Sequence, residues 1–290
     1  MKAGPCHVLR ERSPVINREG LQVSKFDDYK DAYQTIKLER SKDGILQVTL
    51  HNKGGPYTWD FAGIVRDKSR ENTGGAHDEL ADALGHIARD TENKVVILTG
   101  TGDVFSGPPA SRETFPLGGP EFWEHLQFHG NQLLMDLLDI PGPVISCING
   151  PAYRHAEIPF TADIVLAAEG ALIQDSAHFP NNVVPGDGIG LLLPLLMGWN
   201  RGRYFLMMGQ KLSAGELKEI GLVSEVMPRE RLLPRAWEIA EQFIKKNPLV
   251  LRYTRLMLTA PLKALLRQHL QHGHALEALA AVHESSGRGG

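Results

Sequence analysis

The chain has 290 residues, of which 42% are hydrophobic and 22% are charged, and its formal net charge at pH 7 is −3. This much apolar material is enough for a sizeable core and excludes wholesale disorder. The small net charge gives no electrostatic reason to expect nucleic acid or an anionic membrane surface as a partner. The length suits one large domain, or one domain with an appended helical piece.

The start of the chain is polar and lacks the apolar segment of a signal peptide. No apolar run reaches the roughly 18 residues that a membrane span needs. The two cysteines, Cys6 and Cys147, lie in the polar leader and in an apolar stretch, so a disulfide is not expected. We therefore expect a soluble protein of the cytoplasm, with no membrane as a partner.

The first third of the chain predicts an extension, a hairpin and a loop. Residues 1–30 are polar and without a clear period, which indicates an N-terminal extension. Residues 36–40 and 45–50 alternate apolar and polar side chains around a Lys-Asp-Gly turn, as the strands of a hairpin do. A long loop over 51–75 follows and contains Trp59.

Beyond this loop, apolar runs and apolar residues at helical spacing alternate along the chain. The expected buried strands are Val95–Leu98, Val144–Ile148, Ile164–Ala168 and Val223–Val226. The expected helices are His77–Arg89, Phe122–Leu138, Leu191–Met197, one that begins at Gly215 with Ser213 as its cap, Leu232–Lys246, Leu249–Thr259 and Pro261–His283.

Strands that alternate with helices predict an α/β layered fold, and the last three helices predict a helical appendage. We expect a core over residues 31–230, a C-terminal helical region over 231–284 and a frayed tail over 285–290.

Side chains of the types that move protons gather around two of the buried strands. They are His155, Glu157, Asp163, Asp175, His178 and Asp187. Ionisable groups in loops at strand ends, next to glycines and prolines, are typical of a site held by a rigid scaffold. The alternative interpretation is ordinary loop polarity.

Five segments in this order resemble the crotonase superfamily, which includes the enoyl-CoA hydratases and isomerases. They are V-V-I-L-T-G-T-G-D-V-F-S-G (95–107), P-V-I-S-C-I-N-G-P-A (143–152), A-D-I-V-L-A-A-E (162–169), V-P-G-D-G (184–188) and G-Q-K-L-S-A-G-E-L-K-E-I-G-L-V-S-E-V (209–226). The resemblance implies a spiral core of repeated ββα turns, C-terminal helices that close a trimer, and an active site between the two halves of the domain.

The departures from the family pattern bear on the chemistry. Crotonases stabilise a thioester enolate with two backbone N–H groups. One of these positions is Pro109 here, and proline has no N–H to donate. The other normally lies in a Gly-Gly-Gly turn, which here reads Tyr-Arg-His-Ala over 153–156. Because losing one such donor costs about 3 kcal/mol of barrier, the usual thioester chemistry is disfavoured.

The acidic positions of the family have changed as well. Glu157 lies where one hydratase glutamate would be, whereas His178 lies where the second would be. An imidazole is a base whose ordinary pKa, about 6.5, lies near working pH. Asp187 replaces a small residue and is able to orient an imidazole and stabilise its charged form.

These changes resemble the β-diketone hydrolase branch of the superfamily, which includes 6-oxocamphor hydrolase. The resemblance extends to H-A-E-I-P-F-T, Q-D-S-A-H-F-P, N-R-G-R-Y-F-L and H-D-E-L-A. The functional positions of this branch match His155, His178, Asp187, Glu277 and Trp59. The loop between Trp59 and residue 77 is longer here, which affects the expected size of the substrate pocket.

The resemblance implies a cofactor-independent hydrolase that cleaves a C–C bond of a small, apolar, cyclic β-diketone to give a keto acid. We expect His178 and Asp187 to activate water and His155 to donate to a carbonyl. Trp59 would donate its indole N–H or line the pocket, and Glu277 would orient a histidine or the water. A homotrimer or a dimer of trimers is also implied.

Two alternatives stay open, namely an enzyme that processes acyl-CoA thioesters and a non-catalytic scaffold subunit. For each residue the alternative is a structural role in a loop, in the core or on a solvated helix face. Other histidines, such as His125, His129, His272 and His274, have no carboxylate or thiol at metal-ligand spacing along the chain, so no metal site is expected.

Overall fold

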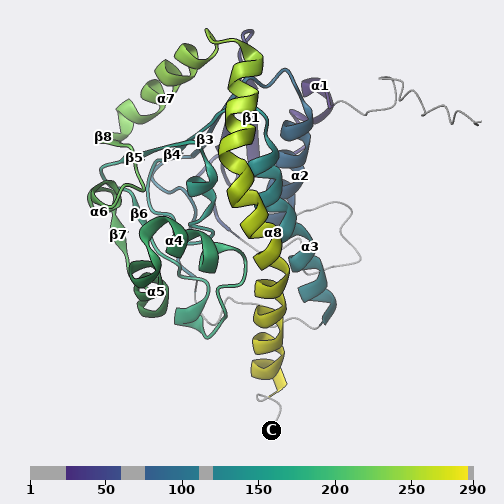
Figure 1. Ribbon diagram of the computed structural model, residues 1–290, viewed down its shortest axis with the longest axis vertical. Helices are drawn as coiled ribbons and strands as arrows, with labels where there is room; N and C mark the ends of the chain where they lie inside the picture. The colour runs from purple at the N-terminus through teal and green to yellow at the C-terminus, as the bar shows by residue number, and fades with distance from the viewer. Residues whose placement is uncertain (1–23, 60–75, 111–119, 287–290) are drawn as a thin grey trace, which may run out of the picture.

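The computed structural model describes residues 24–59, 76–110 and 120–286 and has the α/β fold predicted from the sequence (Figure 1). Most of the expected N-terminal extension, the loop between Trp59 and residue 76, and the last four residues lie outside the described part. The interpretations placed on those segments therefore stay predictions.

A six-stranded sheet forms the centre of the fold, in the order β1-β2-β3-β4-β5-β8. Its strands are β1 (Ile36–Arg40), β2 (Ile45–Leu50), β3 (Val95–Gly100), β4 (Val144–Ile148), β5 (Ile164–Ala168) and β8 (Glu225–Met227). The predicted hairpin is confirmed, since β1 pairs antiparallel with β2. All the other neighbours in this sheet are parallel.

Both faces of β3 and β4 are buried, which explains their continuous apolar sequences. Because side chains alternate along a strand, neighbouring residues belong to two separate clusters. One face packs against α7 (Arg229–Phe243). The other packs against α2 (Ala76–Arg89) and α3 (Pro120–Asp139). The α7 face of the sheet presents Ile45, Val95, Ile97, Ile145, Cys147, Leu166 and Ala168.

The other elements outside the sheet and the long helices are shorter. They are α1 (Phe26–Tyr29), η2 (Ile158–Thr161), β6 (Leu172–Ile173), η3 (Phe179–Asn181), α4 (Ile189–Met197), α5 (Trp199–Met208), β7 (Leu212–Ser213) and α6 (Ala214–Glu219). The predicted cap of α6 is confirmed, because the Ser213 hydroxyl accepts a hydrogen bond from the Glu216 N–H.

The end of the described chain is one helix of 39 residues, α8 (Pro248–Ser286), which runs alongside α3 (Figure 1). The prediction of two helices separated near Pro261 is wrong, because this proline lies inside α8. A proline in a helix interior costs about 3 kcal/mol. Packing of Leu266 and Leu270 into the main core offsets that cost.

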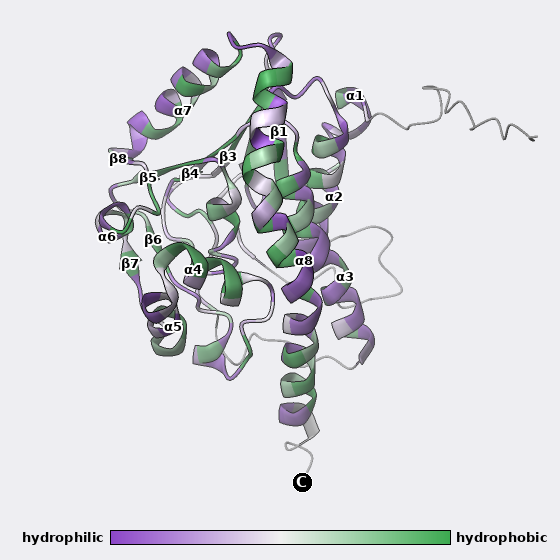
Figure 2. Ribbon diagram, viewed as in Figure 1, coloured by the Kyte–Doolittle hydropathy of each residue, from purple (hydrophilic) through white to green (hydrophobic). Residues whose placement is uncertain are grey.

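Several apolar side chains lie on the surface of α4, α5 and the first half of α8, where Figure 2 shows apolar colouring on the outside of the fold. These exposed residues are Leu195, Leu196, Trp199, Tyr204, Met207, Met208, Leu249, Val250, Tyr253, Leu256, Met257 and Leu258. Among the described residues, no helix is both long and apolar enough to cross a membrane.

Candidate active site

The loops that follow β3 and β4 are fixed to each other at the carboxyl ends of these strands. The Asn149 side chain accepts a hydrogen bond from the Gly100 N–H (3.0 Å) and donates to the Val104 carbonyl (3.1 Å). A side chain on Gly150 would collide with the backbone of Asp103, so only glycine allows this approach. Ligand sites of parallel α/β sheets lie at this edge.

His155 follows β4 in this loop and has a φ of +48°, in the left-handed region. For a residue with a Cβ this conformation costs on the order of 1 kcal/mol. The Nδ1–H of the partly buried imidazole donates to Glu157 Oε1 at 2.7 Å, and Nδ1 lies 3.3 Å from Asp187 Oδ2. Burial opposes the charged ring, but Glu157 and Asp187 outweigh it and raise the pKa of His155. The ring is therefore suited to donate a hydrogen bond from Nε2.

His178 lies between β6 and η3 and is held through the opposite nitrogen. Its Nδ1–H donates to Asp175 Oδ1 at 2.7 Å, which directs Nε2 toward two other carboxylates. Nε2 lies 3.4 Å from Asp187 Oδ2 and 3.8 Å from Glu277 Oε1. Burial opposes the charged ring here too, but Asp175 and Asp187 together raise the pKa of His178 well above its ordinary value.

Asp187 joins the two imidazoles, because the same oxygen, Oδ2, faces both His155 and His178. Its other oxygen accepts the N–H of Ile189 (3.2 Å) at the N-terminus of α4, where the helix dipole favours an anion. Burial opposes ionisation, but His178 and His155 outweigh it and lower the pKa of Asp187. Oδ2 is buried and has no hydrogen-bond partner among the described residues.

Glu277 reaches this site from α8, one helical turn beyond Gly273. Gly273 lies against Gly186, and a Cβ on either glycine would meet the carbonyl oxygen of the other at 2.3 Å. This contact lets α8 approach the loop that carries Asp187. Burial raises the pKa of Glu277 to about 8, although the nearby His178 lowers it. Its carboxyl is therefore protonated over much of the neutral range.

Trp59 and His77 lie on the other side of His155. The Trp59 ring centroid is 4.1 Å and the His77 centroid 5.3 Å from that of His155. The Trp59 Nε1–H is buried and has no hydrogen-bond partner among the described residues. Burial, and then the neighbouring His155, lower the pKa of His77 well below its ordinary value, so that ring is neutral.

The fold brings together all five residues singled out from the sequence, which are Trp59, His155, His178, Asp187 and Glu277. Three further residues contact them but received no role from the sequence: His77, Glu157 and Asp175. Glu157 is two residues after His155, and Asp175 is three residues before His178. This short spacing between an acid and a histidine was the signal in the sequence that could have identified both acids.

The loop that supplies a backbone donor in the family has little to offer here. Pro108 and Pro109 have no N–H, and the N–H of Ala110 donates to the Ser176 hydroxyl at 2.9 Å. The N–H of Tyr153, in the other loop, donates to the Ser106 carbonyl at 2.8 Å. None of these four positions therefore offers a free backbone N–H.

The comparisons with known proteins agree with this fold. A model of the enoyl-CoA hydratase/isomerase family matches residues 73–286. The chain belongs to this family. Among curated members, a probable enoyl-CoA hydratase of Mycobacterium bovis is 27% identical over 73% of this chain and 72% of its own length. A hydroxycinnamoyl-CoA hydratase-lyase of Pseudomonas fluorescens is 26% identical over 77% of this chain and 78% of its own.

Solved structures resemble this chain to different degrees. A β-diketone hydrolase from the cyanobacterium Anabaena sp., bound to (S)-3-oxocyclohexyl acetic acid, is 39% identical, with a TM-score of 0.79 over 86% of this chain and 95% of that one. An enoyl-CoA hydratase from Mycobacterium avium subsp. paratuberculosis is 23% identical, with a TM-score of 0.66 over 85% and 89% of the two chains. The second likeness concerns the fold alone.

Proposed function

We propose that this family member is a hydrolase that cleaves a C–C bond of a cyclic, largely apolar β-diketone and releases a keto acid. The observation that carries the proposal is the Asp187 carboxylate between the buried imidazole of His178 and the partly buried imidazole of His155, beside an indole N–H without a partner among the described residues. The 39% identity to a β-diketone hydrolase supports the same reaction class.

The reaction is a retro-Claisen cleavage. Water adds to one carbonyl, and the bond between that carbon and the central carbon then breaks. The bonding electrons pass to the second carbonyl as an enolate, and a proton on the central carbon completes the keto acid. The reaction needs a base for the water, donors for the enolate oxygen and an acid for carbon. No redox group takes part in this balance.

The base is assigned to Nε2 of His178 with Glu277 and Asp187 around it. Asp175 fixes the ring through Nδ1, so Nε2 points to the position between the two carboxylates. A water there would lose its proton to the pair formed by His178 and Glu277. The resulting acid form of the pair then returns a proton to carbon, so no proton is gained or lost overall.

The donors for the enolate oxygen are assigned to His155 and Trp59. The Glu157 carboxylate holds Nδ1 of His155, which leaves Nε2 for the substrate. The raised pKa of His155 keeps a proton on that nitrogen, and the indole N–H of Trp59 adds a second, neutral donor. Two donors in a buried site are able to replace the missing backbone pair.

Processing of an acyl-CoA thioester is the second candidate, because the family model and the curated relatives carry that activity in their names. The prolines at 108 and 109 and the occupied N–H of Ala110 speak against it. A non-catalytic scaffold is disfavoured as well, because such a scaffold gains nothing from several buried ionisable groups.

The proposal includes assembly of the protein as a homotrimer or a dimer of trimers. The apolar side chains on α4, α5 and the first half of α8 are too many for a typical monomer surface. Static light scattering coupled to gel filtration measures this directly. A monomer at micromolar concentration would contradict it.

A substrate screen tests the activity. Mono- and bicyclic 1,3-diketones lose their enol absorbance when the ring opens, and hydrolysis in H₂¹⁸O puts one ¹⁸O into the product carboxylate. Crotonyl-CoA serves as the comparison substrate. We expect turnover of at least one diketone and none of the thioester. Hydration of the thioester without diketone cleavage would overturn the proposal in favour of the second candidate.

A further inference from the structure

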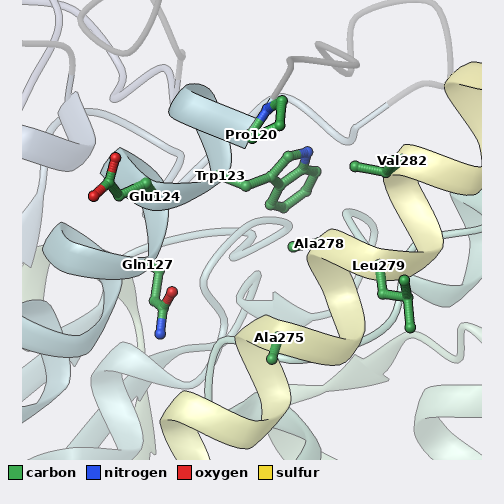
Figure 3. Close-up of a pocket in the computed structure, with 8 residues that line it drawn as sticks. All are labelled: Pro120, Trp123, Glu124, Gln127, Ala275, Ala278, Leu279 and Val282. Carbon is green, nitrogen blue, oxygen red and sulfur yellow. The ribbon is translucent and has the colours of Figure 1, made fainter.

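The helix α3 presents two different faces. Residues 120, 123, 124 and 127 follow helical spacing and line a pocket of about 390 Å³ together with residues of α8, toward which the Trp123 ring extends (Figure 3). His125 and His129 are offset from this row, and His125 contacts Asp78 on α2. The second face therefore brings two imidazoles against a carboxylate of a neighbouring helix.

We propose that Asp78, His125 and His129 form a binding site for a divalent transition-metal ion of the Zn²⁺ type. One ligand atom from each of the three side chains lies within 4.8 Å of the others. The expectation of no metal site considered only spacing along the chain, whereas Asp78 comes from another helix.

The donor set matches the chemistry of such an ion. Two histidines four residues apart share one helix face, and two imidazoles with one carboxylate hold zinc in open sites with a fourth position for water. Metal–ligand bonds of about 2.0–2.1 Å separate tetrahedral ligand atoms by roughly 3.4 Å. Small rotations of the three side chains would bring their ligand atoms to this separation.

Unsatisfied polar atoms supply a second, independent observation. Asp78 Oδ1 and His129 Nδ1 are both buried and have no hydrogen-bond partner among the described residues. Burying such atoms unpaired costs free energy, and buried polar atoms without partners often indicate an ion or water that binds there. The Asp78–His125 contact at 2.9 Å leaves these two atoms unsatisfied.

A bound ion would join α2 to α3 next to the candidate active site. Asp78 directly follows His77, whose Nδ1 lies 3.9 Å from Asp78 Oδ1. The ion would fix the start of α2 and with it the ring of His77. The site is separate from the group formed by His155, Glu157 and Asp187, whose ligand atoms also lie within 4.8 Å of one another.

The test is a titration of the full chain, without an affinity tag, with Zn²⁺ against a chromogenic chelator. We expect one tight equivalent per chain. A His125→Ala/His129→Ala variant should weaken binding by at least about tenfold. A matched His269→Ala/His272→Ala variant, which removes two exposed histidines of α8, should bind as the parent does.

A second measurement covers the case in which a variant folds poorly. Thermal unfolding should show a rise in Tm of roughly 5 °C for the parent at a Zn²⁺ concentration about 100 times Kd, and no such rise for Asp78→Asn. Unchanged Zn²⁺ affinity in the His125/His129 variant would overturn the proposal. So would loss of the tight equivalent on His155→Asn alone, because the ion would then bind at the reaction site.

Discussion

Gly186 and Gly273 cross so closely that neither position has room for a side chain. Gly186 directly precedes Asp187, and Gly273 is one turn before Glu277 on α8. Their contact therefore sets the distance between two acids that both face His178. The C-terminal helix supplies part of the candidate active site because of this contact.

Substitution of Gly273 by Ala should move α8 away from the site. The added Cβ would lie 2.3 Å from the Gly186 carbonyl oxygen, so the backbones must separate. A shift of about 1 Å in a catalytic group is enough to lower kcat by roughly 100-fold. Steady-state kinetics on a diketone substrate check this. The control is Gly215→Ala in α6, where the Cβ meets nothing within 4 Å; equal kinetics of the two variants would contradict the role of the crossing.

His155→Asn is designed to remove the imidazole while keeping the backbone. Asparagine tolerates the left-handed φ of +48° better than most residues, so the variant should fold. Loss of the donor to the enolate should lower kcat/KM by about 100- to 1,000-fold. Circular dichroism and kinetics together separate folding from chemistry. An unchanged kcat/KM would remove His155 from the mechanism.

His178→Ala should abolish turnover to within the assay limit, because general-base catalysis contributes about 100- to 10,000-fold. Asp187→Asn should also reduce kcat strongly, since the amide no longer stabilises a charged ring on either side. Both variants should retain substrate affinity, measured by calorimetry on the inactive proteins. Turnover near the parent rate in His178→Ala would exclude the proposed base.

The pH profile of kcat/KM should rise toward alkaline pH. The pKa of His178 is raised well above its ordinary value and that of Glu277 to about 8, so the form of the pair that accepts a proton increases as pH increases. We expect the acid limb of the profile, which is the pH range over which kcat/KM rises, to end near pH 8. Asp175→Asn should move this limb to lower pH, because Asp175 raises the pKa of both groups.

A merely structural role of Asp175 would reduce stability without moving the limb. An acid limb that lies below pH 6.5, the ordinary pKa of histidine, would contradict the arrangement of charges described above.

Glu277→Gln should stabilise the fold most at high pH. The pKa of Glu277 is about 8 in the folded state and 4.5 ordinarily, so the parent loses stability as pH rises between these values. The loss is up to about 1.4 kcal/mol per pH unit, and glutamine avoids it. Urea unfolding at pH 5, 6.5 and 8 should show a growing difference in the free energy of unfolding. A difference independent of pH would mean that the carboxyl is not buried in its protonated form.

The sequence by itself determined the buried strands and the residue types of the site. Continuous aliphatic runs such as Val144–Ile148 indicate strands buried on both faces. Such a run consists of neighbouring residues, so it can be recognised without knowledge of the fold. Pro109 excluded a backbone donor without any structure, because the missing N–H is a property of the residue. The five site residues followed from the family resemblance, since their roles depend on positions far apart in the chain.

Only the tertiary structure decided how these groups pair. Which carboxylate holds which nitrogen of His178 depends on the direction of the ring, and Asp175, not Asp187, accepts from Nδ1. The continuous α8 through Pro261 depends on packing that offsets a local cost. Gly186 contacts Gly273, which brings Glu277 to the site, and Asp78 contacts His125. The two residues in each contact are more than forty positions apart in the chain. Local periodicity carries no information about such distances, because they are set by how closely packed elements approach each other.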